Sequence, residues 1–91
     1  MERELEFHPA SGDPVRVRIR IGRPVREDQG GWSCPYSIQS VSFSKMFRMV
    51  GEDSMQALIL ALKTIQVELE VLAKNNNGSF TWLGASDLGL L

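Results

Sequence analysis

The sequence predicts an α+β fold, in which one antiparallel β-sheet of about four to five strands carries a single long helix across one face. Three observations support this prediction: a long helical pattern over residues 54–74, a strict two-residue alternation over residues 14–22, and short strand-like segments separated by turn formers. The expected order is β-β-β-β-α-β in a single domain spanning residues 1–91. Because the longest strand and the helix are each about 30 Å long, the helix is expected to cover the sheet.

Residues 2–8 and 14–22 are expected to form a β-hairpin. Valine and isoleucine alternate with arginine in the second segment, and Leu5 and Phe7 alternate with glutamates in the first. A turn centred on Ser11 gives the expected partners: Phe7 with Val15, Leu5 with Val17, Glu6 with Arg16, Glu4 with Arg18 and Glu2 with Arg20. One side of this hairpin is then apolar and the other is a ladder of opposite charges. The arginine row is therefore interpreted as a solvated face and not as an anion site.

The remaining strands are shorter and less regular. Residues 32–39 are expected to form a third strand, with Pro35 marking an edge or a bulge. The apolar positions then change from even to odd numbers, which indicates a turn or bulge within about residues 40–45. Residues 46–50 and 80–83 are expected to form the fourth and fifth strands, before an apolar C-terminal tail.

The helix has clear start and stop signals. Asp53 is a suitable N-cap with Gln56 three residues later, and the run from Asn75 to Gly78 is typical of a helix end. At 100° per residue, one face is expected to pack on the sheet. That face comprises Met55, Leu58, Leu62, Ile65, Leu69 and Leu72.

A second apolar stripe lies on nearly the opposite side of the predicted helix. It comprises Leu60, Thr64, Val67 and Val71, with Ala57 beside it. Exposing large apolar side chains forgoes about 1.5–3 kcal/mol each, so a covering element is expected. Either the C-terminal tail or a second protein chain could provide it; the third alternative is that these are scattered exposed residues, which are common on protein surfaces. These four residues, with the aromatic Trp82 near the tail, form the candidate interface.

Composition excludes several classes of function. The net charge of −1 lacks the positive excess of a nucleic-acid binder, and no apolar run is long enough to cross a membrane. One cysteine rules out an internal disulfide and favours a reducing compartment. The N-terminal residues MERELEF lack the apolar core of a signal peptide. A cytoplasmic protein without nucleic-acid or membrane partners is therefore expected.

No complete catalytic or metal-binding motif is present. Cys34 and His8 are the only residues of their types, and Asp87 is the sole candidate to orient such a pair. No sequence context links these three residues, and the strand pattern predicts that Cys34 is a small buried apolar residue. We therefore expect no catalytic residues, no metal site, no cofactor and no enzymatic activity.

Several segments together resemble a known bacterial family of small proteins classed as a domain of unknown function. They are I-G-R-P at residues 21–24, W-S-C-P-Y at 32–36, G-E-D-S-M-Q-A-L-I-L-A-L at 51–62, and T-W-L-G with D-L-G between 81 and 89. The likeness extends over about residues 14–89. It implies a bacterial protein and no particular activity.

These observations favour a small, non-enzymatic protein-interaction module that binds a protein partner or itself. An isologous contact between two helices would bury Leu60, Val67 and Val71, which makes a homodimer the simplest version. The alternative is a small-ligand binder or minor enzyme that uses a pocket near Cys34, Tyr36 and Trp82.

Overall fold

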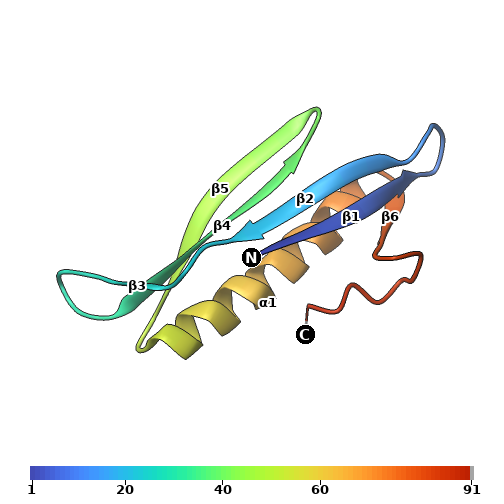
Figure 1. Ribbon diagram of the computed structural model, residues 1–91. Coiled ribbons are helices and arrows are strands. Elements are labelled where there is room, and N and C mark those ends of the chain that lie inside the picture. Colours follow the sequence, from blue (N-terminus) through green and yellow to red (C-terminus); the bar gives the residue numbers. More distant parts are fainter. Residues whose placement is uncertain (91) are drawn as a thin grey trace.

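A computed structural model describes residues 1–90, which form one antiparallel sheet and one helix. The elements in chain order are β1 (Glu2–Pro9), β2 (Val15–Ile21), β3 (Val25–Arg26), β4 (Trp32–Ser40), β5 (Phe43–Gly51), α1 (Ser54–Asn75) and β6 (Gly78–Thr81). Helix α1 lies across one face of the sheet (Figure 1). The predicted α+β architecture is confirmed. The two-residue strand β3 was not predicted, because two residues are too short to show an alternation.

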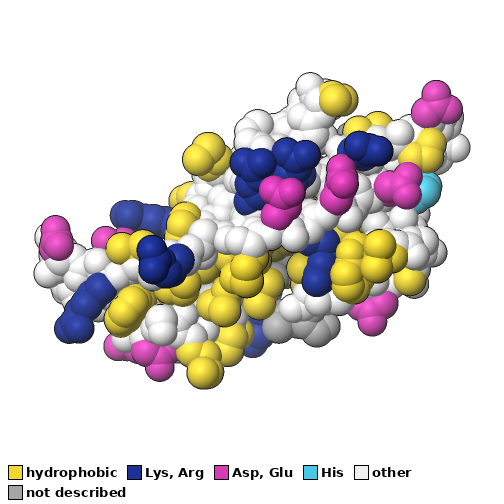
Figure 2. Space-filling view, in the orientation of Figure 1, with side chains coloured by type: hydrophobic (Ala, Val, Ile, Leu, Met, Phe, Trp, Pro, Cys, Tyr) yellow, Lys and Arg dark blue, Asp and Glu magenta, His cyan; other side chains and the backbone are white. Residues whose placement is uncertain are grey.

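The spatial order of the long strands is β5-β4-β2-β1-β6, and β3 runs beside β4 beyond the end of β2. The predicted register of the first hairpin is correct at all five pairs, from Phe7 with Val15 to Glu2 with Arg20. Charged side chains of both signs lie together over β1 and β2 (Figure 2). Glu2 pairs with Arg20 at 2.8 Å and with Arg18 at 3.8 Å, so the ladder includes diagonal neighbours as well as direct ones.

The change of the apolar positions from even to odd numbers has its cause in a hairpin turn at residues 41–42, which joins β4 to β5. Strand β5 begins at Phe43, three residues earlier than the sequence pattern indicated. Pro35 lies in the middle of β4 and causes no break in the register with β5. Its carbonyl accepts a hydrogen bond of 2.8 Å from Gly22 N, just beyond the end of β2. Proline has no N–H to return this bond, and the Gly22 carbonyl instead accepts from the Cys34 thiol at 3.6 Å.

Helix α1 starts and ends as the sequence predicts. The Asp53 carboxylate accepts a hydrogen bond of 2.7 Å from Gln56 N, which satisfies one of the free N–H groups of the first turn. At the other end Asn76 caps the helix, and Asn77 adopts a left-handed backbone conformation with φ of 50° before Gly78. This left-handed residue reverses the chain, which then enters β6 beside β1.

The core lies between the sheet and α1. Its buried apolar residues are Leu5, Val17, Ile19, Ile21, Cys34, Tyr36, Ile38, Ala57, Ala61, Ile65, Leu69 and Phe80. The prediction that Met55 faces the core is wrong, because 69% of its surface is exposed. The helix instead turns Ala57 and Ala61 toward the sheet. The backbone of Gly51 lies against this end of the helix, because a Cβ added at residue 51 would lie 2.5 Å from Ala57 N.

Candidate functional site

The first notable feature of the surface is the open edge of the sheet at β5. Within residues 1–90, β5 pairs only with β4, and it is nine residues long. The other edge strand, β6, has only four residues. A long edge strand presents a row of unpaired backbone donors and acceptors, which is a template for pairing with another chain.

The direction of these backbone groups follows from Pro35. Its carbonyl points toward Gly22 on the β2 side, so Pro35 and its β5 partner Arg48 form a non-hydrogen-bonded pair. The N–H and C=O of Arg48 must then point away from β4. Because the pattern alternates, the same is true of the other even-numbered residues of β5, namely Ser44, Met46 and Val50.

Strand β5 is apolar on both faces, although it lies at an edge. Phe43, Phe47 and Met49 share the helix side with the buried residues of β4, because cross-strand partners project to the same face. Phe47 is 59% exposed and touches Tyr36 in an edge-to-face arrangement, with ring centroids 6.4 Å apart. Met46 and Val50 project to the opposite face and are also exposed. A strand with so much exposed apolar surface is typical of an interaction site.

The second helix stripe lies beside this edge. Val67 is 56% exposed and Val71 is 51% exposed, whereas Leu60 and Thr64 are half-buried. The stripe and β5 are connected by an ion pair between Lys45 of β5 and Glu68 of α1. We define the β5–α1 surface as the apolar area formed by Phe43, Phe47, Leu60, Thr64, Val67 and Val71.

Glu68 connects three elements beneath this surface. Its Oε1 atom accepts a hydrogen bond of 3.0 Å from the Tyr36 hydroxyl on β4 and also binds the Lys45 ammonium on β5. Burial raises the pKa of Tyr36 to about 12, and the hydrogen bond and negative charge of Glu68 act in the same direction. Tyr36 is therefore a neutral hydrogen-bond donor at physiological pH, and the network fixes α1 against the edge of the sheet.

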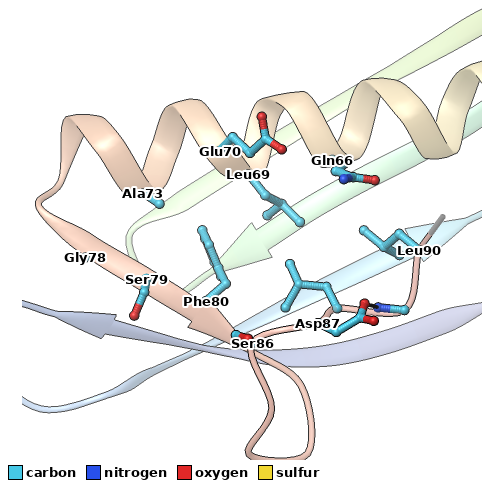
Figure 3. A pocket seen from close by; sticks show the side chains of 12 residues that line it. Gln66, Leu69, Glu70, Ala73, Gly78, Ser79, Phe80, Ser86, Asp87 and Leu90 are labelled. Carbon is cyan, nitrogen blue, oxygen red and sulfur yellow. Dashed lines mark hydrogen bonds between the residues drawn. The ribbon is translucent and has the colours of Figure 1, made fainter.

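The C-terminal tail does not cover the second stripe. Leu88 and Leu90 pack against the core from the other side of the helix, where the tail, β6 and α1 enclose a cavity of about 420 Å³. In Figure 3, Leu90 and Phe80 point into this hollow, and Gln66 and Leu69 line it from the helix. Of the two covering elements considered from the sequence, the tail is excluded for residues up to 90, and Val67 and Val71 stay exposed.

Trp82 lies apart from the other four predicted interface residues. The Arg3 guanidinium lies 3.8 Å from the centroid of its ring, and the tail residue Gly89 packs against it. Arg3 also donates hydrogen bonds to the carbonyls of Leu88 and Gly89 at 3.0 and 2.9 Å. Trp82 is thus half-buried under the tail, where it holds the tail to β1.

The residues considered for catalysis or ligand binding are also separated. Cys34 is fully buried on β4, its thiol lies 3.6 Å from the Gly22 carbonyl, and burial raises its pKa, which disfavours the nucleophilic thiolate. His8 is two strands away on β1 and is hydrogen-bonded to Thr81 at 2.8 Å. Trp82 follows β6, three strand spacings or about 14 Å from Cys34 and Tyr36. The three residues named for a ligand pocket therefore do not line one.

A different pocket of about 330 Å³ opens between the sheet and the C-terminal end of α1. Its apolar walls include Phe7, Val17, Phe43, Leu72 and Phe80. No group of three His, Cys, Asp or Glu residues within residues 1–90 is placed to hold a metal ion. The same part of the chain contains no helix with the length and apolarity that a membrane crossing requires.

Sequence reasoning missed the contribution of β5 to this site. The predicted interface included the helix stripe but neither Phe43 nor Phe47, although a signal was present. Between residues 41 and 50, apolar residues occupy both odd and even positions. A half-buried strand has only one apolar parity, so this pattern predicts a strand with apolar side chains on both faces.

Comparison with known proteins adds a family assignment. No curated protein and no solved structure matches the chain. One family model, described as a domain of unknown function (DUF6968), matches residues 1–91. The chain therefore belongs to the DUF6968 family.

Proposed function

We propose that this protein is a non-enzymatic interaction module that binds another protein chain through the β5–α1 surface. The observation that carries the proposal is that exposed apolar side chains continue from an unpaired sheet edge onto the neighbouring helix stripe. Single exposed apolar residues are ordinary, but an apolar area beside unpaired backbone donors and acceptors combines the two features that strand-pairing partners use. A second copy of the chain is the simplest partner.

The proposal extends to the cellular setting. A single free cysteine suits a reducing compartment, and the sequence analysis led us to expect a bacterial cytoplasmic protein. We retain that setting as part of the proposal. Separation of Cys34, His8 and Asp87 onto different parts of the fold supports a binding role in preference to catalysis.

Site-specific photo-cross-linking tests whether the surface binds protein. A photoreactive phenylalanine analogue is placed at position 71 and, as the matched control, at position 25. Val71 and Val25 are 51% and 55% exposed, but Val25 lies on β3, on the other side of β4 from β5. Irradiation in cells should give a covalent protein adduct from position 71 and none from position 25. Equal labelling at the two positions, or no adduct at position 71, would contradict the proposal.

A further inference from the structure

We infer that the partner at this surface is a second copy of the chain, whose β5 pairs antiparallel with the first β5 in a register centred on Phe47. This inference rests on the proposed function and specifies the partner and its geometry. The two sheets would join into one continuous sheet, related by a two-fold axis perpendicular to it. Both helices would then lie on the same face, antiparallel to each other.

The backbone of β5 is suited to pair with itself. Its outward-facing N–H and C=O groups belong to the even-numbered residues 44, 46, 48 and 50. The midpoint of the nine-residue strand is Phe47, an odd-numbered residue. Complete overlap of two strands about this midpoint places Met46 opposite Arg48 and Ser44 opposite Val50 of the second copy. Every outward-facing residue then meets another outward-facing residue, as an antiparallel ladder requires.

The position of the helix matches what this arrangement requires. Glu68 bonds to Tyr36 on β4 and to Lys45 on β5, so this turn of α1 lies next to the open edge of the sheet. The two-fold axis would place the same turn of the second helix on the other side of the joined strands and on the same face of the sheet.

The second stripe faces the position of the partner helix. The tail packs beside Leu62, Gln66 and Leu69, on one flank of the helix. Val67 and Val71 lie on the opposite flank, which is the one next to the open edge. Pairing of two β5 strands would therefore bring the two stripes face to face across the Phe47 pair, where aromatic and aliphatic side chains would lose contact with water.

The charges at the edge permit contact between identical surfaces. In a two-fold contact the same surface of both copies meets, so an unpaired charge near the axis would lie close to the same charge on the second copy. Here Lys45 is paired with Glu68, and Arg48 Nη1 lies 3.1 Å from Glu27 Oε1 within the same chain. The edge is therefore electrically balanced. It contrasts with the outer face of β2, where three arginines are exposed.

The available area is sufficient for a stable dimer. The edge is about 30 Å long and, from the outer face of the sheet to the far side of the helix, about 20 Å deep. The contact would cover roughly 600 Å² on each copy, at the lower end of the range for specific interfaces. Strand β6 has four residues, less than half the length of β5, and offers a much shorter ladder.

Disulfide cross-linking between variants that each carry one added cysteine tests the register. Ser44→Cys and Val50→Cys are purified separately, mixed, and oxidised mildly. The inference expects a covalent dimer in the mixture, because the two Cα atoms would be about 5.5 Å apart. Neither variant alone should cross-link, because each position is about 20 Å from its own copy. Cys34 is buried and should not contribute.

A shifted register has its own control. A mixture of Ser44→Cys with Met46→Cys should not cross-link, because these positions would be about 14 Å apart in the inferred register. A disulfide in that mixture instead of the first would overturn the register. If sedimentation shows a dimer but the Ser44→Cys and Val50→Cys mixture gives no cross-link, the dimer uses another surface. That result would overturn the inference without affecting the proposed function.

Sedimentation of point variants tests the second copy as partner. Phe47→Asp should raise the dimer dissociation constant at least tenfold while leaving the circular dichroism spectrum unchanged. Val25→Asp, at a similarly exposed site away from the edge, should leave the constant unchanged. Wild-type protein that sediments as a monomer at about 100 μM would overturn the inference. Photo-cross-linking at position 71 would then still decide whether the surface binds a different protein.

Discussion

Alkaline pH should destabilise the protein through the ionisation of Tyr36. The hydroxyl is buried and donates to Glu68, and together these effects raise its pKa from the ordinary value of 10.0 to about 12. The folded state therefore holds the proton more tightly than the unfolded state does. This contribution to stability is complete below pH 10 and is lost as the pH rises from 10 to about 12. The difference in pKa corresponds to roughly 3 kcal/mol of folding free energy.

Two measurements check this prediction. Tyr36 is the only tyrosine in the chain, so the ultraviolet absorbance of the phenolate reports this residue alone. In the folded protein the absorbance change should be centred near pH 12, and in the protein unfolded in guanidinium it should be centred near the ordinary pKa of 10.0. Urea unfolding from about pH 9 to about pH 12 should show the corresponding loss of stability.

Two variants separate the causes. Glu68→Gln removes the negative charge but not the burial, which is the largest cause of the raised pKa. The Tyr36 pKa should therefore fall below that of the wild type but stay above the ordinary value. Tyr36→Phe should abolish this part of the alkaline loss of stability. A native tyrosine that titrates at the same pH as the unfolded chain would refute the reasoning, because the hydroxyl would then be neither buried nor bound to Glu68.

Three further predictions concern single positions. Gly51→Ala should lower the free energy of unfolding, measured by urea denaturation, by about 1–3 kcal/mol, because the added Cβ would lie 2.5 Å from Ala57 N. Val50→Ala, at the exposed neighbouring position, should lower it much less. Leu83→Asn should raise the melting temperature, because Leu83 has a left-handed backbone with a φ of 52° and its side chain is 88% exposed. The left-handed conformation costs asparagine less free energy than leucine, by up to about 1 kcal/mol. Cys34 should react with a thiol reagent at least about 100-fold more slowly in the native than in the denatured protein, because it becomes accessible only when the structure opens; equal rates would contradict its burial.

Much of the fold was predictable because its signals are local. The alternation in β2 and the matching glutamates of β1 determined the hairpin register, since a shift by one residue would have exposed the apolar side chains. Asp53 and the asparagines after Lys74 determined the ends of α1. The core face of the helix was predicted less well. Large residues were favoured over Ala57 and Ala61, although these two are fully buried and the backbone of Gly51 lies against Ala57.

The candidate site depended on contacts between distant segments. The sequence identified an apolar stripe at Leu60, Thr64, Val67 and Val71, because helical periodicity is a property of one segment. It also showed apolar residues of both parities between residues 41 and 50. Trp82 was included because aromatic residues are common at binding sites and because it lies near the apolar tail, but it follows β6, at the opposite edge of the sheet from β5, and its ring packs against Arg3.

Sequence alone determined the helix and most of the longer strands, the first hairpin and the existence of surplus apolar surface on the helix, since each follows from the spacing of side chains along one segment. Only the tertiary structure decided that β5 is the open edge, that the tail packs on the opposite flank of α1, and that Glu68 joins Tyr36 and Lys45. These features depend on strand order and on which flank of the helix each segment reaches. Local periodicity carries no information about either, because both are set by packing between residues far apart in the chain.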